Sequence, residues 1–284
     1  MTLIAAIILG IVEGLTEFLP VSSTGHLTIV SKMLGYDIQD PGVTAFTAVI
    51  QVGAIIAVII YFWSDIARLL VAWFRGLFNK ANRTDPDYRM AWLVIIGSLP
   101  IAIVGFALRH VISDQLRSLW IVAFALILWG IVMLYAEAVA KQNRPEADLN
   151  LMDVLLIGFG QCLALIPGVS RSGATISIGL IRGLDRVAAT RLSFLLGIPA
   201  LIGAGAFELP AALKTQVPTA DHPHPVHVGL APTLVATAVA FVVAYFSVAW
   251  LLKFVSGHSI ANFVWYRWVV GVALIIVLFA GGLS

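Results

Sequence analysis

The chain has 284 residues, of which 60% are hydrophobic and 11% are charged. A soluble domain is about half apolar and about a quarter charged, so no single water-soluble core of this size could bury the excess of apolar residues. The 17 Lys and Arg residues against 15 Asp and Glu residues leave a net charge of +2, which is too small and too dispersed for a nucleic-acid-binding protein. The composition therefore predicts an all-α integral membrane protein.

The chain begins with an apolar stretch, residues 2–19, that lacks the basic start of a secretory signal peptide. Glu13 and Glu17 also interrupt its apolar run, so we expect the stretch to belong to the mature protein. It ends at Pro20, and a second apolar stretch follows over residues 21–34. Two short arms joined by a proline break are typical of a re-entrant hairpin, which is stable at membrane depth only when protein or a wet cavity surrounds it.

Six further stretches are long and apolar enough to cross a membrane, which takes roughly 20 residues. In chain order they cover residues 43–63, 90–108, 119–136, 192–207, 228–252 and 268–283. Between the third and fourth of them, residues 151–166, Pro167-Gly168 and residues 174–181 repeat the pattern of arm, break and arm. We therefore predict six transmembrane helices plus two re-entrant helical hairpins in a single membrane domain that covers residues 1–284.

The two predicted hairpins resemble each other at an offset of 148 residues. The matching positions are Gly10 with Gly158, Leu15 with Leu163, Val21 with Val169, Ser22 with Ser170 and Gly25 with Gly173, and Glu13 falls on Gln161. Each half of the chain, about 1–140 and 150–284, would then hold one hairpin and three spans. Because three is odd, the second half would be inverted in the membrane, as in many transporters.

The distribution of basic residues supports this inverted repeat. The loop 64–90 carries five basic residues and is expected to be cytoplasmic by the positive-inside rule. That orientation, with Arg171 left out as a hairpin residue, places twelve basic residues inside and four outside. The inner ones are Arg68, Arg75, Lys80, Arg83, Arg89, Lys141, Arg144, Arg182, Arg186, Arg191, Lys253 and Arg267, and the outer ones are Lys32, Arg109, Arg117 and Lys214. We expect the hairpins to enter from opposite faces and their tips to meet near the midplane.

The acidic pair in the first hairpin indicates a functional site. Glu13 and Glu17 are four residues apart, so they would share one face of a helix. Charges inside a membrane are costly, and such a pair is stabilised by a divalent cation, a shared proton or a basic neighbour. Mg²⁺ and Ca²⁺ prefer such oxygen ligands. The alternative is that one glutamate caps a helix and the other reaches the interface.

The first break is followed by Ser22-Ser23-Thr24-Gly25-His26. A hydroxyl beside an imidazole is the minimum for an activated nucleophile, which makes Ser23 and His26 candidate catalytic residues. In the alternative interpretation the serines cap the second arm, and His26 bonds a carbonyl group.

The second break is followed by a composition typical of an anion site. Arg171 offers a forked guanidinium suited to phosphate oxygens. Three hydroxyl side chains accompany it: Ser170, Ser172 and Thr175. Arg171 could also pair with Glu13 or Glu17 as a buried bridge, and both interpretations can hold at once. An acidic tip and a cationic tip together provide the groups needed for phosphoryl transfer at a membrane.

These residues carry a family resemblance. Residues 12–26 resemble the glutamate-rich motif of the undecaprenyl-diphosphate phosphatases, the bacitracin-resistance family, and the second tip resembles that family's Pro-Gly-x-Ser-Arg-Ser-x-x-Thr motif. Residues 160–165 also match, and the resemblance extends over essentially the whole chain. It implies a multi-pass enzyme of the bacterial inner membrane that depends on a divalent cation and confers bacitracin resistance. Its reaction would hydrolyse undecaprenyl diphosphate to undecaprenyl phosphate and inorganic phosphate, recycling the lipid carrier for peptidoglycan and cell-envelope synthesis.

The resemblance also implies roles for the residues at the motif positions. The core functional positions are Glu13, Glu17, Ser23, His26 and Arg171, and the supporting substrate contacts are Ser22, Thr24, Ser170, Ser172 and Thr175. We hypothesise that Glu13 and Glu17 hold Mg²⁺ or Ca²⁺, that Arg171 clamps the phosphoryl group, and that His26 activates Ser23. In a rival mechanism His26 activates water directly.

The expected partners are a polyprenyl diphosphate lipid and membrane lipids. The sequence does not decide whether the chain also forms a homodimer. We expect the active site to open to the outer, periplasmic face. The alternative function is a membrane transporter or flippase for a phosphorylated lipid, because inverted repeats with broken helices are also typical of transporters.

Overall fold

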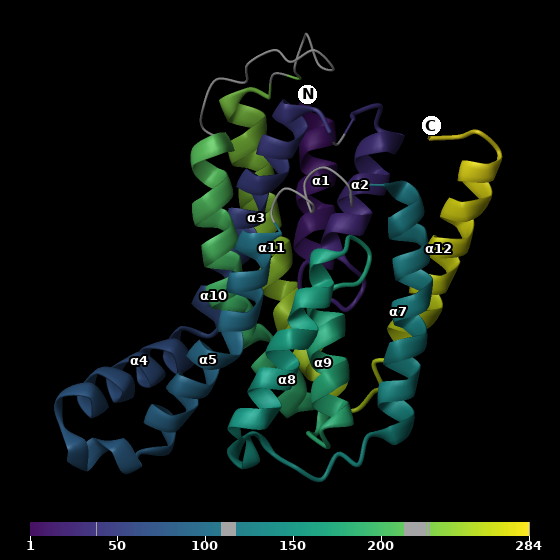
Figure 1. Ribbon diagram of the computed structural model, residues 1–284. Helices are drawn as coiled ribbons and strands as arrows, with labels where there is room; N and C mark the ends of the chain where they lie inside the picture. The colour runs from purple at the N-terminus through teal and green to yellow at the C-terminus, as the bar shows by residue number, and fades with distance from the viewer. Residues whose placement is uncertain (38, 109–117, 213–225, 227, 284) are drawn as a thin grey trace.

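The computed structural model describes residues 1–37, 39–108, 118–212, 226 and 228–283. These residues form a bundle of helices, and no strand occurs among them (Figure 1). In the described part of the chain, six helices are long and apolar enough to cross a membrane, which confirms the predicted fold class. They are α3 (Pro41–Tyr61), α5 (Pro86–Ala107), α7 (Leu119–Val139), α10 (Arg186–Ala212), α11 (Leu230–Val255) and α12 (Asn262–Phe279).

Two pairs of shorter helices form the predicted hairpins. The first pair is α1 (Leu3–Thr16) and α2 (Ser23–Met33), and the second is α8 (Leu151–Cys162), extended by η3 (Leu163–Leu165), and α9 (Arg171–Ile181). The pairs enter the bundle from opposite ends and turn back inside it (Figure 1). Their tips touch, because the backbone N–H of Gly168 donates to Oγ of Ser22 over 3.1 Å. The meeting of the tips is thus confirmed, and their re-entrance into a membrane stays a prediction.

The two tips make the same backbone turn at matching positions. Ser22 has a φ of 78° and Ser170 a φ of 80°, a left-handed conformation that is strained for any residue with a side chain. Each serine is the N-cap of the helix that follows, and its Oγ accepts from the backbone N–H of the glycine three residues on, Gly25 or Gly173. The sequence match between the tips therefore corresponds to a shared local structure, and the repeat of residues about 1–140 and 150–284 stays a prediction.

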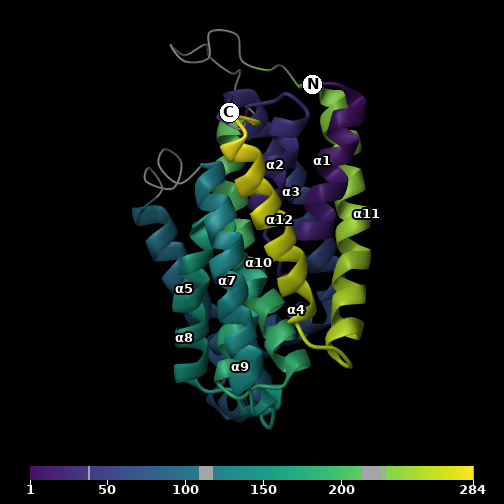
Figure 2. The same ribbon diagram turned by 90° about the vertical axis from the view of Figure 1, so that its right-hand side faces the viewer.

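Glycines let the hairpins pack closely against the spanning helices. A Cβ atom on Gly10 of α1 would lie 2.5 Å from the carbonyl oxygen of Ala236 on α11, which runs beside α1 (Figure 2). In the second half, a Cβ atom on Gly158 of α8 would lie 2.2 Å from the carbonyl oxygen of Gly97 on α5. Close backbone approach through small residues is typical of helix pairs in membranes. These contacts fix how deep each hairpin sits in the bundle.

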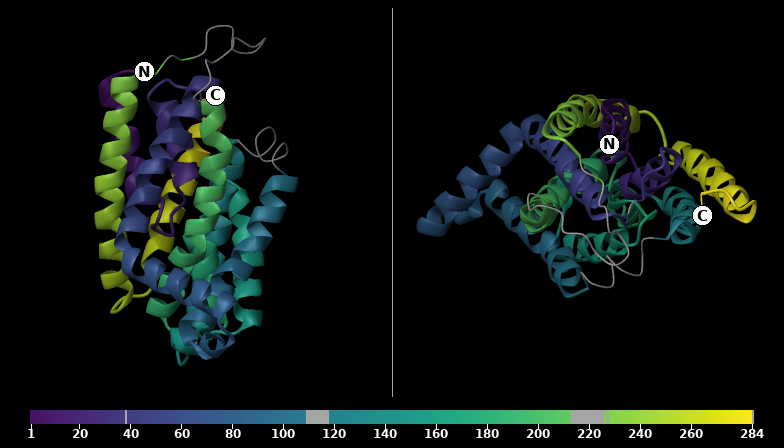
Figure 3. Two further views of the ribbon diagram at one scale, coloured as in Figure 1. Left: turned by 90° about the vertical axis from the view of Figure 1, so that its left-hand side faces the viewer. Right: turned by 90° about the horizontal axis from the view of Figure 1, so that it is seen from above.

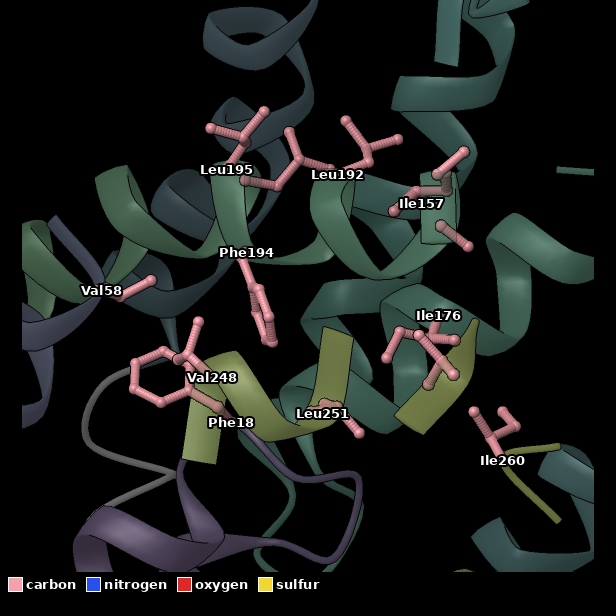
Figure 4. Close-up of a cluster of buried hydrophobic side chains, with 14 of the residues drawn as sticks. Phe18, Val58, Ile157, Ile176, Leu192, Phe194, Leu195, Val248, Leu251 and Ile260 are labelled. Atoms are coloured by element: carbon pink, nitrogen blue, oxygen red, sulfur yellow. The ribbon is translucent and has the colours of Figure 1, made fainter. Parts of the chain in front are cut away.

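The largest hydrophobic cluster lies against the break of the first hairpin. Phe18 is fully buried and meets the ring of Phe194 on α10 edge to face, with 5.5 Å between the ring centroids. Figure 4 shows both rings among buried side chains that include Val248 and Leu251 of α11. This packing holds the non-helical segment after Glu17 in a defined place, because the neighbouring apolar side chains leave Phe18 no room to move.

The prediction that residues 64–90 form a loop is wrong. The segment forms the helix α4 (Trp63–Phe78), the short η1 (Lys80–Thr84) and the first turn of α5. The chain is helical there because apolar side chains recur at helical spacing, with Leu70, Phe74 and Phe78 on an exposed face. Seen from above, α4 and the start of α5 project from the bundle as an arm (Figure 3, right).

Two helices begin six residues before the predicted start of their span. The span predicted at 192–207 is α10, which begins at Arg186, and the one predicted at 268–283 is α12, which begins at Asn262. Arg267, assigned above to the cytoplasmic side, is fully buried inside the bundle. Of the other counted residues, Arg109, Arg117 and Lys214 lie outside the described part of the chain, so the structure does not test the charge split.

The base of the second hairpin is held by an ionic cluster. Asp153, in the first turn of α8, lies 2.6 Å from Nη2 of Arg144 and 2.8 Å from Nε of Arg182. Burial alone would raise the pKa of Asp153, but the hydrogen bonds from both guanidinium groups outweigh burial and hold the pKa below its usual value. The carboxylate therefore stays charged and fastens the start of α8 to the end of α9, near Arg182.

Candidate active site

A cavity of about 280 Å³ lies where the two hairpin tips meet. Much of its polar lining comes from the two hairpins at and near their tips: Glu13, Glu17, Ser22, Ser23, Thr24, Ser170 and Arg171. Its other walls come from α3, α5 and α10, and they include the apolar side chains of Ile101 and Leu201. The structure therefore brings the acidic and cationic residues predicted from the two breaks into one chamber.

Glu17 lines this chamber and connects the tips. Its Oε2 accepts a hydrogen bond of 2.6 Å from Oγ of Ser23, and its Oε1 lies 3.1 Å from Nη2 of Arg171. Charge-assisted hydrogen bonds of this kind are short and strong. The predicted pairing of Arg171 with an acidic residue is thus confirmed, and the pair joins one hairpin to the other.

Glu13 lies one helical turn before Glu17 and is 1% exposed. Its Oε1 has no hydrogen-bond partner among the described residues. A buried carboxylate oxygen without a partner is costly, so this atom is suited to a ligand that the chain itself does not provide. No group of three or more His, Cys, Asp or Glu side chains among the described residues could hold a metal ion. A cation here would therefore have two carboxylates at most, which suits Mg²⁺ bound together with substrate phosphates.

Arg171 fits into its place because α10 has a glycine opposite it. A Cβ atom on Gly197 would lie 1.5 Å from Nη1 of Arg171, so the guanidinium occupies the space that a side chain would fill. The same Nη1 donates to the carbonyl oxygen of Ser193 over 3.5 Å, and the guanidinium lies over the ring of Phe18 at 5.8 Å. These contacts leave the guanidinium at the cavity wall, where it is mostly buried.

The hydrogen bonds of the His26 ring go to residues other than Ser23. Its Nδ1 lies 2.7 Å from the carbonyl oxygen of Ser22, and its Nε2 lies 2.8 Å from the hydroxyl of Tyr266 on α12. Because a carbonyl group only accepts, Nδ1 carries the proton and Nε2 accepts from Tyr266. The predicted hydroxyl–imidazole pair is not formed in this structure, because the Ser23 hydroxyl donates to Glu17 and both ring nitrogens of His26 are engaged elsewhere.

The five predicted substrate contacts fall into two groups. Ser22, Thr24 and Ser170 line the cavity. Ser172 and Thr175 are buried behind it: Oγ of Ser172 lies 3.2 Å from Oγ of Ser170, and the Thr175 hydroxyl donates to Oγ of Ser193 over 2.6 Å. In this geometry the second group supports the tip from behind, and its predicted role in substrate contact is not tested.

Sequence reasoning missed several residues of the chamber. The polar side chains of Thr28, Thr47 and Gln51 line it, and Gly197 makes room for Arg171. Gln51 had a signal in the sequence, because it is the one strongly polar residue of the predicted span 43–63. Arg267 and Tyr266 do not line the chamber, but they contact the tips and were also missed; their signal was a charged and a polar residue within a strongly apolar stretch.

Comparison with known proteins shows which proteins this chain is similar to. Residues 6–273 match the model of the family described as bacitracin resistance protein BacA. An undecaprenyl-diphosphatase of Cutibacterium acnes is 56% identical over 272 residues, which cover 95% of each chain. Undecaprenyl-diphosphatase 3 of Frankia casuarinae is 54% identical over 284 residues, covering 100% of this chain and 99% of the relative, and undecaprenyl-diphosphatase 1 of Streptomyces coelicolor is 53% identical over 270 residues, covering 95% and 93%.

Proposed function

We propose a function from one premise: the chain belongs to the bacitracin resistance protein family. It is a multi-pass membrane enzyme that hydrolyses undecaprenyl diphosphate to undecaprenyl phosphate and inorganic phosphate. This reaction recycles the lipid carrier for peptidoglycan and envelope synthesis, and bacitracin resistance follows from it. The observation that carries the proposal is the line of contacts from Ser23 through Glu17 to Arg171, which crosses from one tip to the other.

The chamber is suited to a diphosphate attached to a lipid. Arg171 provides positive charge, and α2 and α9 both begin at the tips, so their free N-terminal N–H groups favour an anion there. The apolar walls, including Leu27, Ile101 and Leu201, suit the first units of a prenyl chain. The head group would therefore lie between the tips, with the chain directed along the apolar side.

The geometry favours Ser23 as the nucleophile and Glu17 as its base. As Oγ of Ser23 attacks the terminal phosphorus, its proton passes to Oε2 of Glu17, with which it already shares a hydrogen bond. A bond from Oγ to phosphorus forms while the bond from phosphorus to the bridging oxygen breaks, and undecaprenyl phosphate leaves. Arg171 stabilises the charge on the transferred group. Glu17 passes the proton from Ser23 to the leaving oxygen of undecaprenyl phosphate and is a carboxylate again. Water then attacks the phosphorus of the phosphoserine and gives a proton to Glu17, the bond from phosphorus to Oγ breaks, and Glu17 returns the proton to Oγ of Ser23 as inorganic phosphate leaves.

We propose that Glu13 and Glu17 hold a divalent cation, Mg²⁺ or Ca²⁺. The unpartnered Oε1 of buried Glu13 supports this assignment. When bound, the cation would neutralise the diphosphate charge and polarise its oxygens.

We propose that the protein lies in the bacterial inner membrane and that the chamber opens toward its outer face. The lining residues Leu27 and Thr28 lie in the first half of α2, after the tip, and Thr47 lies in the first half of α3, which starts at the end of the bundle that holds both chain ends (Figure 1). The chamber thus extends from the tips toward that end. The basic arm of α4 lies at the other end, which the positive-inside rule makes cytoplasmic.

Phosphate release by the purified protein tests this proposal. The full chain in detergent or nanodiscs is supplied with undecaprenyl diphosphate, and inorganic phosphate is measured with and without a chelator. We expect turnover by the wild type, loss of turnover in Ser23→Ala, and loss with chelator that Mg²⁺ or Ca²⁺ reverses. Wild-type protein that releases no phosphate would contradict the enzyme function, and turnover that survives chelation would contradict the cation assignment alone.

A further inference from the structure

Arg267 of α12 is a buried cation that the proposed chemistry does not use. Its side chain is fully buried, and all four hydrogen bonds that it makes with described residues go to backbone carbonyl oxygens. Placing a guanidinium inside a membrane protein is costly, so a residue kept there has a specific role. The carbonyl groups that it contacts indicate what that role is.

Arg267 holds both hairpin tips at once. Nη1 donates to the carbonyl oxygen of Pro20 over 3.0 Å, and Nη2 donates to the carbonyl oxygen of Gly168 over 2.8 Å. Both carbonyl groups belong to the non-helical breaks, where the backbone has no helical partner at membrane depth. The fork of a guanidinium can bridge two such oxygens, and the point charge of a lysine cannot bridge them in the same geometry.

The same side chain fastens the tips to α7. Nε donates to the carbonyl oxygen of Leu126 over 3.2 Å, and Nη2 also reaches that of Ala125 over 3.3 Å. The preceding residue, Tyr266, donates its hydroxyl to His26, whose other ring nitrogen donates to the carbonyl oxygen of Ser22. Two consecutive residues of α12 therefore hold the first tip at two points.

The position of the tips decides the geometry of the active site. Glu17 lies three residues before Pro20, and Arg171 lies three residues after Gly168. Their ion pair, 3.1 Å long, joins two segments that are distant in the sequence. The guanidinium of Arg267 holds these two segments in their relative position. A shift of about 1 Å at a reacting group can lower turnover about a hundredfold, so this register matters for catalysis.

We propose that Arg267 is a positioning residue that clamps the two tips together, so that Glu17 and Arg171 act on one phosphoryl group. Its effect on turnover rests on the proposed phosphatase function, but the clamp itself does not. Tyr266 supports it by holding His26 and, through His26, the backbone at Ser22.

The test compares Arg267→Lys and Arg267→Met with a matched control, Arg89→Met. Arg89 also donates to a backbone carbonyl group, that of Leu149, but it lies at the beginning of α5, away from the tips. The full-length variants are measured for kcat, KM and thermal midpoint, and for hydrogen–deuterium exchange in residues 20–26 and 167–173. Should Arg267→Met fail to fold, Arg267→Lys and Tyr266→Phe carry the test.

The expected result has two parts. Hydrogen–deuterium exchange in both tips rises in the Arg267 variants and stays at the wild-type level in Arg89→Met. In the Arg267 variants kcat also falls about a hundredfold, while KM changes little. In the double variant Arg267→Lys/Arg171→Lys, kcat should fall by less than the product of the two single-variant reductions. The reason is that both substitutions disturb the same alignment of the two tips. Unchanged hydrogen–deuterium exchange at the tips, or a wild-type kcat in folded Arg267→Lys, would contradict the proposed role of Arg267. Raised exchange in a protein whose wild type releases no phosphate would uphold the clamp and reject the phosphatase function.

Discussion

At the scale of single residues, the site depends on which group the Ser23 hydroxyl contacts. Sequence proximity suggested His26, which follows Ser23 by one helical turn. The structure assigns the hydroxyl to Glu17, which precedes the break, because the turn at Ser22 brings the start of α2 back against the end of α1. Local spacing could indicate the candidate residues, but the contact between them is set by the path of the break.

This contact predicts that Ser23 and Glu17 act as a unit. Ser23→Ala removes the nucleophile, and Glu17→Gln keeps the size of the side chain but removes its basicity, so each should lower kcat about a thousandfold or more. The double variant should be no slower than either single variant. Phosphate release kinetics check this, with Thr84→Ala at the far end of the arm as a control. A Ser23→Ala enzyme within about tenfold of wild type would exclude a covalent serine and favour direct attack by water.

The space beside Arg171 gives a second prediction at this scale. In Gly197→Ala the new methyl group would meet the guanidinium at 1.5 Å, so Arg171 has to leave the cavity wall. We expect kcat to fall about a hundredfold, because the charge no longer faces the phosphoryl group. Gly203→Ala is the matched control on the same helix, since a Cβ atom there meets nothing within 4 Å. Equal activity of the two variants would contradict the assigned place of Arg171.

At the scale of elements, the hairpins depend on glycines that let backbones touch. α1 packs on α11 and α8 packs on α5 through the matching residues Gly10 and Gly158, so corresponding helices of the two predicted halves use the same kind of contact. The sequence match at an offset of 148 residues indicated these positions without saying what they contact. Contact partners could not be predicted, because they lie on spans whose order in the bundle depends on the whole fold.

Gly158→Ala tests this packing. The added methyl group would lie 2.2 Å from the carbonyl oxygen of Gly97, so α8 and α5 must separate, and overpacking of this kind costs about 1–3 kcal/mol. We expect the thermal midpoint to fall by several degrees. Gly105→Ala, where the nearest atom would be 3.8 Å away, should leave it unchanged. A Gly158→Ala protein as stable as wild type would show that the two helices can move apart freely.

At the scale of the whole molecule, composition and apolar runs predicted most of the architecture. Six spans and two broken hairpins follow from run length and from Pro20 and Pro167, because lipid excludes unpaired backbone. The amphipathic α4 was missed because run length alone was considered and helical periodicity was not. Arg267 was misassigned for a related reason: a cation near the end of an apolar run was read as an orientation signal, and its backbone partners come from three separate segments of the chain.

The orientation of the molecule in the membrane is the remaining prediction, and it decides which face supplies the substrate. Gln39 precedes α3 and Ala81 follows α4, so these exposed residues lie at opposite ends of a spanning helix about 30 Å long. In a Cys162→Ala background, Gln39→Cys should react with a membrane-impermeant maleimide in intact spheroplasts, and Ala81→Cys should react only in inverted vesicles. The reason is the positive charge of the arm, which keeps Ala81 in the cytoplasm. Reversed labelling would place the chamber on the cytoplasmic side and exclude uptake of the lipid diphosphate from the outer leaflet.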